Sequence, residues 1–387
     1  MRPLTSPRAL RTCGRIDEAI GVSRLWPLRQ GRRDYNRGVL QHFSERLARG
    51  ENLRPDECEA AVDHLVSEAE PAASKAAFLC DLALKGETVE EIAAFAGALR
   101  AKSVQPALSE ATRSGEILDV CGTGGDRLNT FNISTTVAII CSAAGIAVAK
   151  HGNRAITSQA GSADVLEALG VRIDLSPAEA AQSLAERNFA FFFAPNYHPA
   201  FRFIAPARKL CADRGQRTIF NFLGPLLNPA RPTAQLVGVP RPSLCEPLAQ
   251  VLQRLGVRRA MVVSGKVSMN GAPDSYLDEL SILGDNTVAE FYQERGFTSS
   301  TLSPEGFSPQ AATLSDLTGG DRAANAEIVR AILDGKDRGL KRDSVLFNAA
   351  AALMLAGRSR TLADGWDAAA GVIDSGRARE KLSELAS

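Results

Sequence analysis

The stretch that most constrains this chain is the glycine-dense segment 119–126, Asp-Val-Cys-Gly-Thr-Gly-Gly-Asp, which follows the apolar pair Ile117-Leu118. Residues 130–135, Thr-Phe-Asn-Ile-Ser-Thr, come next, and residues 133–144 are mostly apolar or small. This order predicts a buried strand, a glycine-rich turn and a buried helix. Such a turn directs backbone N–H groups and the positive end of a helix dipole toward an anion, most often a phosphate. The segment matches neither the dinucleotide fingerprint nor the P-loop, and a tight turn that needs only small residues is the alternative interpretation.

Composition is typical of an ordinary globular protein. The 387 residues are 45% hydrophobic and 23% charged, which allows a large core in one or two domains. The formal net charge is +1, so no overall field recruits nucleic acid or an anionic membrane, and we expect neither partner. Apolar runs stay far below the ~18 residues of a membrane span.

The seven cysteines are scattered, odd in number and without C-x-x-C spacing. This distribution argues against a disulfide framework and against a zinc site, and it is typical of a reducing compartment. We therefore expect a cytoplasmic protein. Cys121 lies inside the glycine motif, where we interpret it as a small apolar filler rather than a nucleophile.

The N-terminal part of the chain has two compositions. Residues 1–35 are arginine-rich, with few acids and no helical period, and we expect a disordered extension there. Residues 36–107 carry apolar repeats of three and four, and Thr88-Val-Glu-Glu91 has the form of a capping box. A small all-helical domain is predicted for this part. Its helical pattern ends near residue 102, and residues 103–114 are expected to form a linker to the next domain.

From residue 108 onward, apolar strands alternate with helices. The expected strands are 117–120, 146–149, 189–193 and 259–263. Continuous apolar strands separated by helices indicate a large α/β domain whose central sheet is mainly parallel and flanked by helices.

A second candidate anion cradle follows the strand expected at 146–149. Its residues are Lys150, His151, Gly152, Asn153 and Arg154, then Thr157 and Ser158, then Ser162. Ligands of open α/β sheets collect at the carboxyl ends of the strands, so two such loops at consecutive strand ends indicate a phosphate-bearing ligand. For either loop alone, a solvated surface turn is the alternative.

Two further groups complete the candidate site. Arg208 precedes the ordered Gly224-Pro225 turn, and a guanidinium there suits a carboxylate bidentately, although such loops often only turn the chain. Asp278 and Glu279 are adjacent carboxylates in an apolar context. Exposed Asp-Glu pairs commonly have no function, but beside phosphate cradles they suit Mg²⁺, which binds through one or two carboxylates plus substrate phosphates.

Taken in order, these strings resemble the anthranilate phosphoribosyltransferase family from about residue 38 to the C-terminus. The matching strings are Gly122-Thr-Gly-Gly-Asp126, Asn132-Ile-Ser-Thr135, Lys150-His-Gly-Asn-Arg154, Arg217-Thr-Ile-Phe-Asn221, Leu223-Gly-Pro-Leu-Leu-Asn-Pro229 and Asp278-Glu279. The resemblance implies a nucleoside phosphorylase-like fold. The helical domain would be completed by helices around 199–222, and the α/β domain would comprise residues 108–198 and 223–387. A homodimer through the helical domain is also implied.

The resemblance further implies an activity and its site. The chain would transfer the phosphoribosyl group of 5-phosphoribosyl 1-pyrophosphate (PRPP) to the amine of anthranilate in L-tryptophan biosynthesis, with Mg²⁺ as cofactor. The implied PRPP contacts are Gly122, Gly125, Asp126, Thr130, Asn132, Ile133, Ser134, Thr135, Lys150, His151, Gly152, Asn153, Arg154, Thr157, Ser158 and Ser162. Anthranilate would contact Gly122, Asn153 and Arg208, and Mg²⁺ would be held by Ser134, Asp278 and Glu279. Positioning and electrostatics would carry the reaction, with His151 a candidate proton relay or a binding group.

Two other functions stay open at this point. A pyrimidine nucleoside phosphorylase of the same fold has a glycine-rich turn and a lysine in its second loop, but its base-binding residues do not resemble residues 151–154. A non-enzymatic relative that binds nucleic acid should carry a basic groove and degraded metal residues, whereas this chain keeps Asp278-Glu279. The chain departs from the family in a longer segment between Arg208 and Arg217.

Overall fold

The computed structural model describes residues 38–387 except 156–158, 268–273, 294 and 309–311. The predicted extension at 1–35 and the predicted PRPP contacts Thr157 and Ser158 lie outside the described residues.

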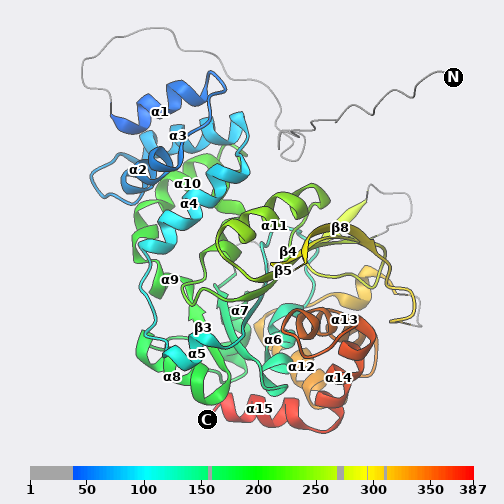
Figure 1. Cartoon of the computed structure of the whole chain (residues 1–387). Coiled ribbons are helices and arrows are strands. Elements are labelled where there is room, and N and C mark those ends of the chain that lie inside the picture. The colour runs from blue at the N-terminus through cyan, green and yellow to red at the C-terminus, as the bar shows by residue number, and fades with distance from the viewer. Residues whose placement is uncertain (1–37, 156–158, 268–273, 294, 309–311) are drawn as a thin grey trace, which may run out of the picture.

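A helical bundle occupies one end of the molecule (Figure 1). Its N-terminal helices are α1 (Val39–Leu47), α2 (Pro55–Leu65), α3 (Ala72–Lys85) and α4 (Val89–Ala101). The predicted capping box opens α4: the N–H of Glu91 donates to Thr88 Oγ1 (3.2 Å), and the N–H of Thr88 donates to Glu91 Oε2 (2.8 Å). Val39 and Leu84 belong to the predicted apolar pattern, but their side chains are exposed, at 38% and 46%.

Helix α10 (Ala205–Ala212), from the middle of the chain, lies against α3. The buried Lys75 of α3 donates from Nζ to the carbonyls of Ser67 (2.6 Å) and Phe203 (2.8 Å). The sulfur atoms of Cys80 and Cys211 lie 3.5 Å apart between the two helices. On these contacts we propose that the segment around 199–222, with 3₁₀ turns η2 (Pro199–Phe203) and η3 (Ile219–Asn221), completes the helical domain.

The described residues form one eight-stranded sheet with the order β3-β2-β1-β4-β5-β7-β8, and β6 pairs with β5. The strands are β1 (Ile117–Gly122), β2 (Ala147–Gly152), β3 (Phe189–Phe193), β4 (Ala234–Gly238), β5 (Arg259–Val267), β6 (Ser275–Leu277), β7 (Asn286–Tyr292) and β8 (Gly296–Leu302). Strands β1 to β5 are mutually parallel, and β6, β7 and β8 join antiparallel. The predicted fold, a small helical domain with an α/β domain around a mainly parallel sheet, is confirmed.

Helices cover both faces of the sheet, which is why the parallel strands are continuously apolar. On one face, α6 (Ile133–Ala143) and α13 (Leu340–Leu355) lie against the strands. The same core includes α7 (Ser162–Ala168), α12 (Arg322–Leu333), α14 (Leu362–Asp374) and α15 (Arg377–Leu385). The other face packs on α11 (Cys245–Arg254), whose core is continuous with the helical bundle, and on α8 (Pro177–Arg187). The site lies along the edge where β1, β2 and β4 end.

Three features differ from the sequence-based expectations. Strand β2 continues to Gly152, because its ladder with β3 holds through the Gly152–Phe193 pair, so Lys150 and His151 are strand residues rather than loop residues. Strands β4 and β6 to β8 were not predicted. The predicted linker contains the short helix α5 (Glu110–Ser114). Within the described part of the chain, no helix has the length and apolar character to cross a membrane.

Candidate active site

The carboxylates of the site come from a loop that crosses the ends of β1 and β4. Asp278 and Glu279 directly follow β6, while Gly122 and Gly238 are register partners at the ends of β1 and β4. A Cβ on Gly122 would overlap Asp278 Oδ2, and a Cβ on Gly238 would overlap the Asp278 carbonyl oxygen. Glycine is therefore required at both positions by the close approach of the loop. Gly122 was predicted as a site residue, whereas Gly238 was missed.

The glycine-rich turn wraps around Asp278. Gly124 and Gly125 have φ values of 76° and 88°, in the left-handed region that favours glycine. The N–H of Gly124 donates to Asp278 Oδ2 (2.6 Å). Asp126 Oδ1 accepts the N–H of Leu128 (3.2 Å), which fixes the carboxyl within the turn.

Helix α6 begins beside Glu279. The N–H of Ser134, in the first turn of the helix, donates to Glu279 Oε1 (3.2 Å), as a helix N-terminus does to an anion. Asn132, at the N-cap, is held by donation from its Nδ2 to the Ala160 carbonyl (3.3 Å) and by a bond from Asn325 Nδ2 to its Oδ1 (3.0 Å). Thr130 forms an isolated bridge with Thr318.

The side chains of two predicted PRPP contacts are buried within the core. Ile133 and Thr135 are each 1% exposed. Thr135 Oγ1 has no hydrogen-bond partner in the described structure. Only the backbone N–H groups of these residues, at the start of α6, are suited to meet a phosphate.

Negative charge accumulates where the turn, the loop and α6 meet. Burial raises the pKa of Asp278 well above its ordinary value, and the charges of Asp126 and Glu279 raise it further. Burial also raises the pKa of Glu279 to about 7, opposed by the charge of Lys150. Three carboxyl groups thus lie in one another's field, and a bound cation would stabilise their charged forms.

The donor set fits Mg²⁺ bound together with a substrate. No group of three His, Cys, Asp or Glu side chains in the described residues is arranged to hold a metal by itself. Asp278, Glu279 and the Ser134 hydroxyl offer hard oxygen atoms, and Mg²⁺ characteristically takes few protein ligands and completes its shell with phosphates and water.

The end of β2 supplies the buried cation. Lys150 is 2% exposed, and its Nζ donates to the Val120 carbonyl (2.7 Å) and to Ser134 Oγ (3.4 Å). Burial lowers the pKa of Lys150, and the charge of Asp119 opposes that shift. Lys150 therefore links the second cradle to the first turn of α6.

The loop after β2 closes onto α7. A Cβ on Gly152 would overlap Ser162 Oγ and come within 2.8 Å of the Phe191 ring. The Asn153 carbonyl accepts from the Ser162 hydroxyl (3.4 Å) and from the N–H of Ala163 (3.2 Å). These contacts bring together Gly152, Asn153 and Ser162, three of the residues of the predicted second cradle.

The Arg154 side chain is engaged in ion pairs within the protein. Its guanidinium pairs with Asp164 (2.9 Å) and Glu167 (3.0 Å) on α7, and it lies 5.8 Å from the Phe193 ring centroid. The charge of Arg154 is thus already compensated, which leaves its backbone as the group suited to face a ligand.

A row of rings joins the end of β2 to Arg208. Ring centroids are 5.3 Å apart for His151 and His198, 5.1 Å for His198 and Phe201, and 5.7 Å for Phe201 and Phe220. Arg208 Cζ, on α10, lies 5.5 Å from the Phe220 centroid. A half-buried guanidinium at the end of an aromatic wall suits a planar aromatic carboxylate. His198 was not predicted as a site residue.

Both histidines in this row are neutral. Burial lowers the pKa of His151 to about 3 and that of His198 to about 4. His151 Nδ1 lies 3.2 Å from the Gly224 carbonyl, which can only accept, so Nδ1 carries the hydrogen and Nε2 has a lone pair. That Nε2 atom is buried and has no partner among the described residues.

Positive charge lies on another side of the glycine-rich turn. The pKa of Arg217 is lowered by burial and then by the charges of Arg241 and Arg127. Arg127 and Arg241 follow the turn after β1 and the end of β4, so the three guanidinium groups share the strand-end edge. None of the three was predicted as a ligand.

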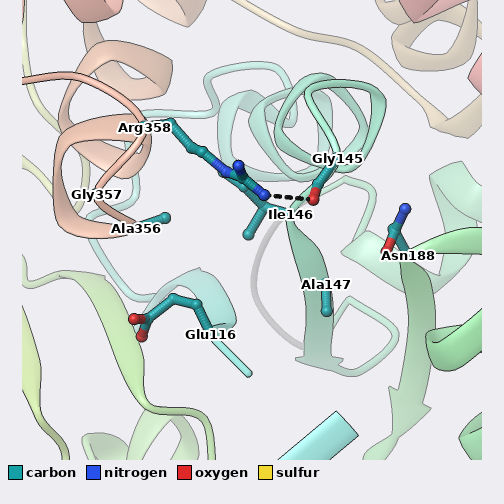
Figure 2. A pocket seen from close by; sticks show the side chains of 8 residues that line it. All are labelled: Glu116, Gly145, Ile146, Ala147, Asn188, Ala356, Gly357 and Arg358. Atoms are coloured by element: carbon teal, nitrogen blue, oxygen red, sulfur yellow. Dashed lines mark hydrogen bonds between the residues drawn. The ribbon is translucent and has the colours of Figure 1, made fainter. Parts of the chain in front are cut away.

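A separate cavity of about 280 Å³ lies at the opposite edge of the sheet (Figure 2). Glu116, Ala147 and Asn188 line it at the starts of β1, β2 and β3, and Arg358 reaches in to donate to the Gly145 carbonyl (2.9 Å). None of the predicted site residues lines this cavity.

Comparison with known proteins identifies the chain as a member of a two-domain glycosyl transferase family. The family described as glycosyl transferase family, helical bundle domain, matches residues 41–103, and the glycosyl transferase family, a/b domain, matches residues 114–379. Anthranilate phosphoribosyltransferase of Petrotoga mobilis is 42% identical over 347 residues, covering 90% of this chain and 96% of that protein. The same enzyme of Lacticaseibacillus casei is 45% identical with the same coverage.

Solved structures agree. The Thermus thermophilus enzyme superposes with a TM-score of 0.78 at 38% identity, covering 89% of this chain and 98% of that one. The Saccharomyces cerevisiae enzyme in complex with PRPP and Mg has a TM-score of 0.78 at 27% identity, covering 90% and 96%. The chain belongs to the anthranilate phosphoribosyltransferase family, as the sequence motifs predicted.

Proposed function

We infer that this chain transfers the phosphoribosyl group of PRPP to the amine of anthranilate, releasing pyrophosphate, as a Mg²⁺-dependent step of L-tryptophan biosynthesis. The observation that carries this inference is the convergence of Asp126, Asp278 and Glu279 on the glycine-rich turn and the start of α6. The relatives named above, one of them solved with PRPP and Mg, support the same activity.

The reaction demands little covalent chemistry from the protein. The amine of anthranilate attacks C1′ of PRPP with inversion, the C1′–O bond to pyrophosphate breaks, and the amine gives up one proton to pyrophosphate or solvent. The protein must therefore align a weak aromatic nucleophile and stabilise charge on the leaving group. Backbone N–H groups of the turn and of α6, with Lys150, suit the phosphates. Mg²⁺, held by Ser134, Asp278 and Glu279, would supply charge neutralisation of the pyrophosphate.

The individual roles are proposals that rest on the geometry of the site, except that those of Thr157 and Ser158 rest on the sequence alone. For PRPP we retain the contacts predicted from the sequence, with Ile133, Thr135 and Arg154 acting through their backbone groups. Gly122, Asn153 and Arg208 would meet anthranilate, with Arg208 on its carboxylate. The lone pair on His151 Nε2 suits an N–H of the anthranilate amine, which supports a binding role for His151.

One assay separates this function from the same-fold alternative. Anthranilate fluorescence is followed with PRPP and Mg²⁺, in parallel with phosphorolysis of thymidine and uridine. We expect PRPP-dependent loss of anthranilate and no nucleoside cleavage. Nucleoside cleavage without anthranilate consumption would replace the proposal with a pyrimidine nucleoside phosphorylase. The comparisons give no support to that alternative or to a nucleic-acid-binding role.

We also propose a homodimer through the helical domain and a cytoplasmic location. Val39 of α1 and Leu84 of α3 are the exposed apolar side chains that support a bundle interface. The scattered, odd-numbered cysteines support a reducing compartment.

A further inference from the structure

Asn348, on α13, forms hydrogen bonds with the backbone of Leu280, the residue that follows the carboxylate pair. Its Oδ1 accepts the N–H of Leu280 (2.9 Å), and its Nδ2 donates to the carbonyl of the same residue (2.8 Å). A third bond from Nδ2 to the Ser344 carbonyl (2.9 Å) fixes the orientation of the amide. Asn348 is 0% exposed, so water does not compete for these bonds.

Asn286, the first residue of β7, forms the same pair of hydrogen bonds with the backbone of Ser281. Its Oδ1 accepts the N–H of Ser281 (2.6 Å), and its Nδ2 donates to the Ser281 carbonyl (3.0 Å). The same Nδ2 lies 3.2 Å from the carbonyls of Gly284 and Leu302. Asn286 is also 0% exposed. Two buried amides from distant elements therefore hold consecutive peptide units.

On its opposite side, the loop of residues 278–281 contacts three glycines. Gly122 and Gly238 allow Asp278 to cross the ends of β1 and β4, and a Cβ on Gly265 of β5 would come 2.5 Å from the Glu279 carbonyl oxygen. Residues 278–281 are thus confined between three strands and two asparagine side chains.

We propose that Asn348 and Asn286 are positioning residues that hold the Asp278 and Glu279 carboxylates ready for Mg²⁺ and PRPP. The proposal rests on the proposed function above. Without these bonds, the loop would have to be ordered when the cation and PRPP bind. A restrained loop removes this reorganisation from the binding step.

The test uses Asn348→Leu and Asn286→Leu, which keep side-chain size and remove both bonds to the loop. PRPP is titrated calorimetrically into the full-length variants at several Mg²⁺ concentrations, without anthranilate. At limiting Mg²⁺ we expect PRPP affinity to fall about tenfold or more, as when groups that orient metal ligands are replaced, and to recover at saturating Mg²⁺. The KM for anthranilate, measured at saturating Mg²⁺ and PRPP, should stay within about twofold, because no acceptor contact changes.

Two control variants on α13 separate positioning from general stability. Ser344→Ala removes a buried hydroxyl that has no hydrogen-bond partner in the described residues, one turn from Asn348. Ala351→Gly lowers the stability of the same helix without touching the loop. Both should keep the wild-type Mg²⁺ dependence even where the melting temperature falls. The same Mg²⁺ dependence in the leucine variants, or a shift shared by the controls, would overturn the proposal.

Amide hydrogen exchange tests the same claim without substitution, should the leucine variants not fold. The N–H groups of Leu280 and Ser281 should be protected as strongly as those of α13 without Mg²⁺ and PRPP, and fast exchange would contradict a preset loop. A wild-type chain that binds no PRPP with Mg²⁺ would refute the proposed function instead.

Discussion

Arg208 is the residue that we propose to bind the carboxylate of anthranilate. Burial lowers the pKa of its guanidinium, which nevertheless stays charged at neutral pH and has an aromatic ring beside it. Arg208→Ala should raise the KM for anthranilate by about tenfold or more, the cost of a lost charged hydrogen bond, while the KM for PRPP changes little. Steady-state kinetics with each substrate varied in turn measures both.

The neighbouring Lys209→Ala is the matched control for Arg208. Lys209 is on the same helix, but its side chain is 76% exposed and pairs with Asp213. Both KM values should be unchanged in this variant. If Arg208→Ala raised the two KM values equally, its role on the anthranilate carboxylate would be wrong.

Glu87, between α3 and α4, is a carboxyl whose burial outweighs the nearby charge of Lys85. It is 1% exposed, neither carboxyl oxygen has a hydrogen-bond partner in the described residues, and burial raises its pKa from 4.5 to about 7. Between those pH values the folded chain binds more protons than the unfolded chain, so the contribution of Glu87 to the unfolding free energy falls as pH rises.

Glu87→Gln should remove this pH dependence. Relative to the wild type, the variant should gain up to about 3 kcal/mol of unfolding free energy as pH rises from below 4.5 to above 7. Denaturant titrations at pH 5 and pH 8, at one protein concentration, measure the difference. Parallel pH profiles for the two proteins would show that Glu87 is ionised and stabilised in the folded chain.

Among the strands and loops, β4 meets the Asp278 loop most closely at Gly238. Gly238→Ala would force a methyl group into the Asp278 carbonyl, so we expect a loss of about 1–3 kcal/mol of unfolding free energy and weaker PRPP binding at limiting Mg²⁺. Gly371→Ala on α14 is the matched control. A Cβ there meets nothing within 4 Å, and the helix should gain about 0.5–1 kcal/mol. Equal stability changes in the two variants would contradict the close approach of the loop.

The sequence allowed the elements with simple patterns to be predicted. Strands near 117, 146, 189 and 259 were predicted because their apolar runs are continuous. Strand β4 was missed because the buried Gln235 interrupts its pattern, and only the structure reveals that its Nε2 donates to the Pro225 carbonyl (3.0 Å). Strand β8 carries exposed serine and threonine at the sheet edge, so it lacks an apolar signal.

The candidate site was predictable to the same degree. The sequence indicated the two cradles and the Asp278-Glu279 pair, and the family resemblance assigned ligands to them. Gly238, Asn286 and Asn348 could not be predicted, because each matters only through contact with a loop distant in sequence. Local sequence patterns do not predict such long-range contacts.

The whole molecule combines a helical bundle with an α/β domain, and its assembly is a proposal. Leu84 is exposed on α3, so Leu84→Glu should shift the chain from dimer to monomer while the far-UV circular dichroism spectrum stays unchanged. Light scattering coupled to size-exclusion chromatography measures the mass, with Lys209→Ala as a surface control. A monomeric wild type, or a dimer unaffected by Leu84→Glu, would exclude this interface.

We propose that Asp278, Glu279 and the start of α6 hold Mg²⁺ and PRPP for attack by anthranilate. The most direct measurement quantifies anthranilate consumed and pyrophosphate released by the full-length chain, with Mg²⁺ and with EDTA. We expect release of one pyrophosphate per anthranilate consumed with Mg²⁺, and neither consumption nor release with EDTA. Anthranilate consumption that persists in EDTA, or pyrophosphate release without loss of anthranilate, would contradict it.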